Sequence, residues 1–184
     1  MTVRALRKAV AADLEALFKN DFFKTPETAP EEEWPEWLKE LPQPVPDWHL
    51  HRMAAPKAYE QYLPLKTMDN GAIDPSAEDP FPYIIVRADK GGIEDPTAAP
   101  KADVILLIGI FDDDPKNQGH EAVLEIIERI QMHYQETSLL AGQFVCQEPF
   151  EWALQEEESY PYYFGACQLT FAMQAPRAKW SDLV

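Results

Sequence analysis

The chain has 184 residues, 46% of them hydrophobic, which is enough for one domain with a buried core. Its 32 Asp and Glu residues outnumber its 16 Lys and Arg residues, and the formal net charge is −16. Because carboxylates repel phosphates, sequence-specific nucleic-acid binding is not expected. The sequence has no apolar run of about 18 residues and no apolar leader, so we expect neither a membrane span nor secretion, and both cysteines should stay reduced in the cytoplasm.

Residues 2–23 have the pattern of an amphipathic helix. Charged residues separate the apolar ones, which recur at helical spacing as Leu6, Val10, Leu14, Leu17 and Phe18. Pro26 is expected to bound this helix, because proline cannot continue a helical hydrogen-bond pattern.

Residues 24–80 lack the regular apolar spacing of the first helix and predict a Pro/Trp-rich irregular insert. Six prolines between residues 24 and 48 break any long element. Between them, residues 31–41 predict a short helix with an aromatic face made by Trp34, Trp37 and Leu38. With Trp48, these are the candidate interaction residues, because tryptophans need a surface to cover. This arm either wraps its own domain or reaches a neighbour. Residues 49–62 predict a short strand or helix.

The second half of the chain predicts four strands and one helix. The strands are 82–88, 103–111, 143–152 and 162–173, and the helix is 120–137. Residues 103–111 are apolar on both faces, which is typical of a central strand with both faces covered. In a chain with few helices, another subunit is a candidate for the second cover.

These elements predict an α+β fold: a mixed, mostly antiparallel β-sheet flanked by an N-terminal helix and by a second helix between strand pairs. We expect residues 1–184 to form a single domain, with the irregular insert at about 24–80.

The carboxylates and histidines offer no strong catalytic or metal site. Residues 112–114 are three consecutive aspartates, which cannot all face one ion and are expected to form a solvated turn. His49 and His51 would share a strand face, but no further ligand completes a zinc site. The glutamates at 156–158 are expected to lie in a solvated loop.

The cysteines and serines offer no nucleophile. Cys146 and Cys167 alternate with apolar residues and should pack as small buried hydrophobes. A catalytic thiol would need a nearby base and a positive surrounding, which this acidic chain lacks. Ser138 and Ser159 stand outside any nucleophile-elbow motif. The sequence therefore predicts no catalytic residue, no metal, no cofactor and no enzyme.

Four short motifs nevertheless resemble a known family. They are residues 81–86 (FPYIIV), 108–113 (IGIFDD), 126–130 (IIERI) and 160–165 (YPYYFG). Together with the N-terminal helix and the order of elements over 80–175, they look like the tail terminator or tail-completion (minor tail) proteins of phages and prophages. The stretch 26–48 has no counterpart in that resemblance.

The resemblance implies a structural role in virion assembly. It implies a ring, commonly a hexamer, that caps the tail tube and helps to join the tail to the head. The implied partners are further copies of the chain, the tail tube protein and a head-completion protein, and the implied locations are the host bacterial cytoplasm and the virion tail. It brings no catalytic residue, and an acidic lumen would let DNA pass without sticking.

Two other classes of function remain open at this stage. The first is a monomeric protein-binding module that uses the Trp-rich arm 34–48. The second is an enzyme that works with carboxylates such as Asp112 and Glu157, which would need a concave pocket that perturbs their pKa values. A ring predicts a fixed oligomer, whereas a binding module predicts a monomer with exposed tryptophans.

Overall fold

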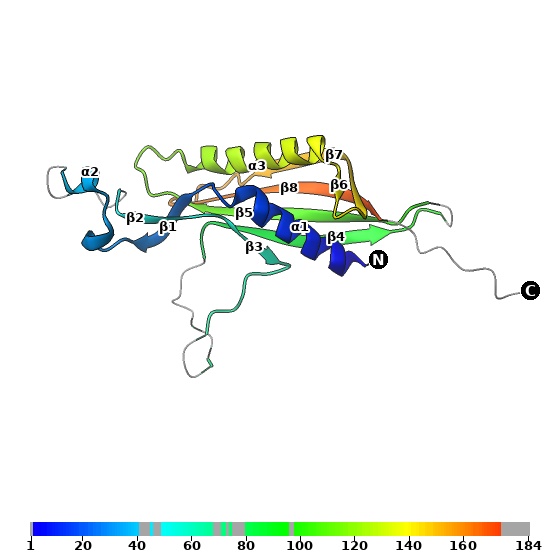
Figure 1. The fold of residues 1–184 in the computed structure, drawn as a ribbon, viewed down its shortest axis with the longest axis horizontal. Coiled ribbons are helices and arrows are strands. Elements are labelled where there is room, and N and C mark those ends of the chain that lie inside the picture. The colour runs from blue at the N-terminus through cyan, green and yellow to red at the C-terminus, as the bar shows by residue number, and fades with distance from the viewer. Residues whose placement is uncertain are drawn as a thin grey trace, which may run out of the picture.

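The computed structural model describes residues 2–40, 45, 49–67, 71, 72, 74, 80–95 and 98–173. The candidate residue Trp48 lies outside the described residues. Helices α1 (Val3–Phe18) and α3 (Gly119–Glu136) pack with a six-stranded sheet, and a two-stranded sheet lies at one end (Figure 1). The predicted α+β class is confirmed.

The main sheet has the order β3-β4-β5-β8-β7-β6. Its strands are β3 (Lys57–Glu60), β4 (Tyr83–Gly92), β5 (Lys101–Phe111), β6 (Leu139–Leu140), β7 (Phe144–Leu154) and β8 (Tyr162–Met173). Strand β3 pairs with β4 in parallel, and all other pairs in the sheet are antiparallel. The sheet is therefore mixed and mostly antiparallel, as predicted.

Helix α1 begins at an N-cap, because the Thr2 side chain accepts a hydrogen bond from the Ala5 amide at 3.2 Å. The helix ends at Phe18, so the prediction that it reaches residue 23 is wrong. The chain turns at Lys19 and Asn20 and enters strand β1 (Phe23–Thr28), which the sequence pattern did not reveal. Pro26 is tolerated in β1 because β1 has a neighbour on one side only.

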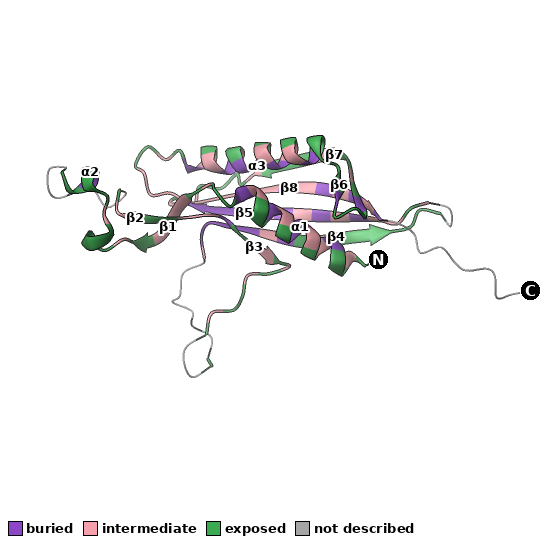
Figure 2. Ribbon diagram, in the orientation of Figure 1, coloured by how far each residue is buried: buried purple, intermediate pink, exposed green. Residues whose placement is uncertain are grey.

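Both helices cover the same face of the main sheet, since their buried residues join one core with β4, β5 and β8. Polar contacts hold α1 and the turn after it against α3: Asp13 Oδ2 lies 2.8 Å from His133 Nε2, and Asp21 Oδ1, beyond the end of α1, lies 2.7 Å from Arg129 Nη1. Along β5 the even-numbered residues from 102 to 110 are buried under the helices, whereas Ile105 and Leu107 are half-buried on the other face (Figure 2). In the described chain no helix packs on that second face.

The predicted short helix at 31–41 is wrong in its form. The chain makes a 3₁₀ turn η1 (Glu31–Glu33) and a separate four-residue helix α2 (Glu36–Lys39). Pro35 separates them, because the residue before a proline avoids the helical region, and Trp34 accordingly has ψ 137°.

Strand β1 pairs with β2 (His51–Ala54) in an antiparallel two-stranded sheet. From here on, the arm means the described residues between 23 and 54, a longer segment than the Trp-rich stretch 34–48. Figure 1 shows the arm beyond the end of the main sheet at which β5 finishes. In the described part of the segment 24–80, the strands are β2, β3 and all of β1 except its first residue.

Both edges of the main sheet are poor templates for another strand. Beyond the short β3, the Gln61 side chain takes the place of a strand: it donates to the Ala88 carbonyl at 3.3 Å and accepts from the Ala88 amide at 3.2 Å. On the other edge, β7 is covered by β6 for two residues only, and then carries Pro149 inside an irregularity between Gln147 and Glu151. Proline, bulges and charge are common means of preventing edge-to-edge pairing.

Candidate interaction site

The turn after β5 attaches the arm to the main sheet. Lys24 of β1 places its Nζ 2.6 Å from Asp112 Oδ1 and 3.5 Å from Asp113 Oδ1. His51 of β2 places its Nε2 2.9 Å from Asp113 Oδ2. We call these four residues the clasp. The two aspartates are therefore not the solvated turn that the sequence predicts, because each of them binds a side chain of the arm.

The clasp is partly shielded from water. The side chain of His51 is 8% exposed, those of Lys24 and Asp113 are 23% and 21% exposed, and the His51 ring packs edge-on against Phe111 at 4.9 Å. The Tyr160 hydroxyl donates to the Asp113 carbonyl at 2.8 Å and holds the turn from the other side. Ion pairs that are removed from water are screened less than surface pairs, so the clasp can fix the position of the arm.

The contact with Asp113 also determines which ring nitrogen of His51 donates. An aspartate carboxylate only accepts hydrogen bonds, so the Nε2 atom carries the proton and donates it to Asp113. The other ring nitrogen, Nδ1, is buried and has no hydrogen-bond partner. The two histidines have different neighbours, because His49 is exposed and packs edge-on against Trp37 whereas His51 contacts Asp113. Among the described residues, no group of three or more His, Cys, Asp or Glu side chains could hold a metal ion.

The candidate aromatic residues of the arm do not share one face. The Trp34 indole N–H donates to the Ala29 carbonyl at 2.9 Å, and Leu38 is only 2% exposed. Both face the inside of the arm, where they line a hollow of about 360 Å³ together with residues of β2. Trp37, by contrast, is 58% exposed. The base of the arm is therefore attached to its own domain, whereas Trp37 is presented to solvent.

The thiols are buried in a way that suppresses the reactive thiolate. Cys167 lies in the core, and burial raises its pKa to about 12. Cys146 is half-buried, and burial is the main cause that raises its pKa to about 11. Neither is a plausible nucleophile near neutral pH.

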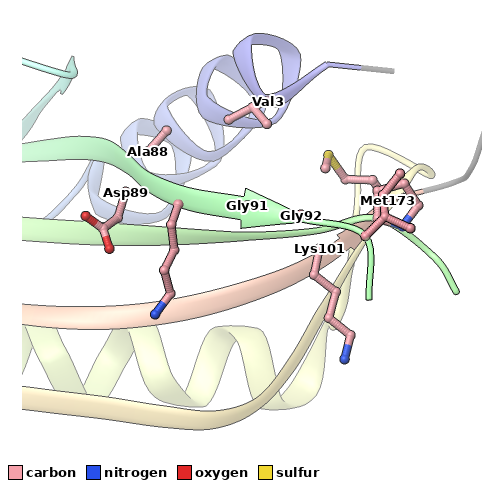
Figure 3. A pocket seen from close by; sticks show the side chains of 10 residues that line it. Val3, Ala88, Asp89, Gly91, Gly92, Lys101 and Met173 are labelled. Atoms are coloured by element: carbon pink, nitrogen blue, oxygen red, sulfur yellow. The ribbon is translucent and has the colours of Figure 1, made fainter. Parts of the chain in front are cut away.

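A further hollow of about 300 Å³ lies at the hairpin between β4 and β5, at the end of the sheet away from the arm (Figures 1 and 3). Val3, Met173 and two glycines contribute to its wall, and Lys101 points away from the ribbon (Figure 3). Its two lysines already have carboxylate partners: Lys90 Nζ lies 3.4 Å from Asp103, and Lys101 Nζ lies 3.3 Å from Glu94. Neither lysine of this hollow, among the residues that the structure describes, is therefore free to bind an anionic ligand.

Comparison with known proteins does not place the chain in a family. It matches no protein-family model, and a search of curated proteins finds no match either. Within the residues that the structure describes, no helix is both long enough and apolar enough to cross a membrane.

Proposed function

We propose that this chain is a structural tail protein of a phage or prophage, a tail terminator or tail-completion protein. It assembles as a ring, with six subunits as the expected number, at the end of the tail tube and helps to join the tail to the head. Its partners are then further copies of itself, the tail tube protein and a head-completion protein. It works in the host bacterial cytoplasm during assembly and afterwards in the virion tail, without catalysis or cofactor.

The observation that carries this proposal is the attached arm. A closed ring is built from heterologous contacts, so each subunit must offer two different surfaces to its two neighbours. The arm lies beyond the end of the sheet, is fixed there by Lys24 and His51, and leaves Trp37 uncovered. A fixed arm with an exposed tryptophan suits contact with a neighbour, because little conformational entropy is lost when it binds. The four tail-protein motifs add support from the sequence.

The test uses tail tubes assembled from a purified phage tail tube protein. The protein is mixed with tubes, the tubes are sedimented, and the bound rings are counted by mass and by electron microscopy. Trp37→Ala should lower ring formation on tubes at least tenfold, because a buried interfacial tryptophan typically contributes about 2 kcal/mol or more. The unfolding free energy of the Trp37→Ala variant should stay near that of the wild type, because Trp37 is 58% exposed.

A matched control is Tyr62→Ala, which removes another aromatic residue, 69% exposed, that lies outside the arm. Rings that form equally well with both variants would refute the role of the arm. A protein that never binds tubes, but binds a different protein through Trp37 as a monomer, would favour the binding module over the ring.

A further inference from the structure

The face of the main sheet opposite the helices carries two ordered rows of side chains. The first row crosses four strands as Ile85 on β4, Leu107 on β5, Ala166 on β8 and Ala153 on β7. Directly paired residues of neighbouring strands point to the same side of the sheet. This row is therefore apolar throughout, with two large side chains at one end and two small ones at the other.

The second row lies beside the first and is ordered by charge. It consists of Arg87 on β4, Ile105 on β5, Gln168 on β8 and Glu151 on β7. Three strand spacings separate the backbones of Arg87 and Glu151 by about 14 Å. Both side chains are exposed, and neither forms an ion pair within the described residues.

We propose that this face packs against the same face of a second copy of the chain, about a two-fold axis that runs parallel to the strands. Such an axis reverses the order of the strands across the interface. Arg87 then faces Glu151 of the partner subunit, and Glu151 faces Arg87 of the partner subunit. A two-fold axis across the strands would instead place Arg87 against the same residue of its partner. The charges therefore select one of the two arrangements.

The same axis also matches the sizes of the side chains. It places Ile85 and Leu107 over the two alanines of the partner's first row. A shallow hollow of about 610 Å³ lies on this face, and Ala153, Ala166 and Ile105 are among its lining residues. The large residues of the second copy would fill it. Two sheets that pack in this way lie about 10 Å apart with strands about 30° from parallel.

Other occupants fit the face less well. The tail tube protein would need its own row with the opposite order of charge, whereas a second copy supplies that order by symmetry. Additional strands are disfavoured by the blunted edges at Gln61 and Pro149. The proposal goes beyond the ring function, because it concerns a dimer of the free protein and a surface that does not include the arm.

The face is only four strands wide, so the area that it can bury is small compared with the roughly 800 Å² per partner of tight complexes. The dimer is therefore measured by sedimentation velocity up to about 1 mM protein, where weak association still appears. Arg87→Glu places Glu opposite Glu151 in both symmetric contacts, and Glu151→Arg places Arg opposite Arg87. Each variant alone should weaken the dimer at least tenfold.

The decisive experiment mixes the two variants in equal amounts. In a heterodimer of Arg87→Glu with Glu151→Arg, both contacts again join opposite charges, so wild-type affinity should return. Arg4→Glu and Glu125→Arg are matched controls, because they change the net charge equally on exposed helix surfaces and should leave the dimer intact. Native mass spectrometry of variants that differ in mass identifies the heterodimer.

Three results would overturn the proposal: a wild-type protein that is monomeric at every concentration, a mixture that does not recover association, or controls that weaken the dimer as much as the two variants do. Association of this face with tail tubes in place of a second copy would also overturn it. Trp37→Ala separates the two proposals, because it should lower ring formation on tubes at least tenfold while the free dimer persists.

Discussion

Replacing Asp113 with alanine should release the arm while the main sheet stays folded. The change removes the acceptor of the His51 Nε2–H bond, and the His51 side chain is 8% exposed, so its donor has little access to water. An unsatisfied buried donor costs about 1–3 kcal/mol. Loss of the 3.5 Å contact with Lys24 adds up to about 1 kcal/mol, because both partners are partly exposed and Lys24 keeps Asp112.

Hydrogen exchange resolved by peptide measures this effect, since it reports local opening separately from global unfolding. Amides in β1 and β2 should exchange about fivefold to several-hundredfold faster in Asp113→Ala, which corresponds to about 1–4 kcal/mol. Amides in β5 and β8 should be unchanged. Asp113→Asn keeps an oxygen that can accept from His51 and should show a smaller effect. Equal exchange of β1 and β2 in all three proteins would refute the attachment of the arm through the clasp.

Two further predictions concern the core and the thiols. Ile127→Ala should lower the unfolding free energy by about 2–5 kcal/mol in urea, because Ile127 is 1% exposed, whereas Met132→Ala on the same helix should change it little, because Met132 is 56% exposed. Native Cys146 should react slowly with a thiol reagent at pH 8, and Cys167 more slowly still, because burial raises their pKa values to about 11 and about 12; both should react rapidly in urea. The folded pKa of Cys167 lies above its ordinary value of 9.0, so the contribution of this thiol to the unfolding free energy is fully present below pH 9 and is lost as the pH rises toward 12. Cys167→Ala should therefore reduce the loss of stability at alkaline pH more than Cys146→Ala does.

Local periodicity revealed the elements that bury one continuous face. The apolar spacing at 120–137 anticipated α3, which spans Gly119–Glu136, and the alternation at 162–173 anticipated β8 with the same bounds. The strand at 103–111 begins two residues earlier in the structure, at Lys101. In each of these elements the pattern records contact with a single large core, and that contact dominates the choice of conformation.

Local periodicity could not reveal the clasp, because the residues that contact each other in it are distant in sequence. Lys24 and Asp112 are separated by 88 residues, and His51 and Asp113 by 62. Turn chemistry alone describes 112–114 as a solvated turn, and only the pairing of β1 with β2 brings the two arm side chains to it. The two arm strands are short and one contains a proline, so neither has enough alternation to be recognised.

The prediction that the aromatic residues of the arm share one face was wrong because it considered spacing alone. Spacing within a helix predicted one face for Trp34, Trp37 and Leu38, but that rule requires an unbroken helix. Pro35 interrupts it, so Trp34 precedes α2 in extended conformation while Leu38 turns inward. A proline between the members of an expected face is a signal that could have prevented the error.

The two apolar faces of β5 have different roles in this fold. One face, which includes Leu106 and Ile108, is covered by α1 and α3 and is needed for the chain to fold at all. The other face buries Phe111 in a second, smaller cluster with Phe81 and Tyr83, but leaves Ile105 and Leu107 half-buried. It runs between charges of opposite sign at its two flanks. Ile105 and Leu107 thus expose hydrophobic area on a chain of net charge −16, and they do not belong to the buried core of the monomer. The two flanking charges are opposite in sign, so reversing the strand order in a second copy brings opposite charges together. The two-fold arrangement across the strands would instead bring like charges together, and this difference gives the surface specificity.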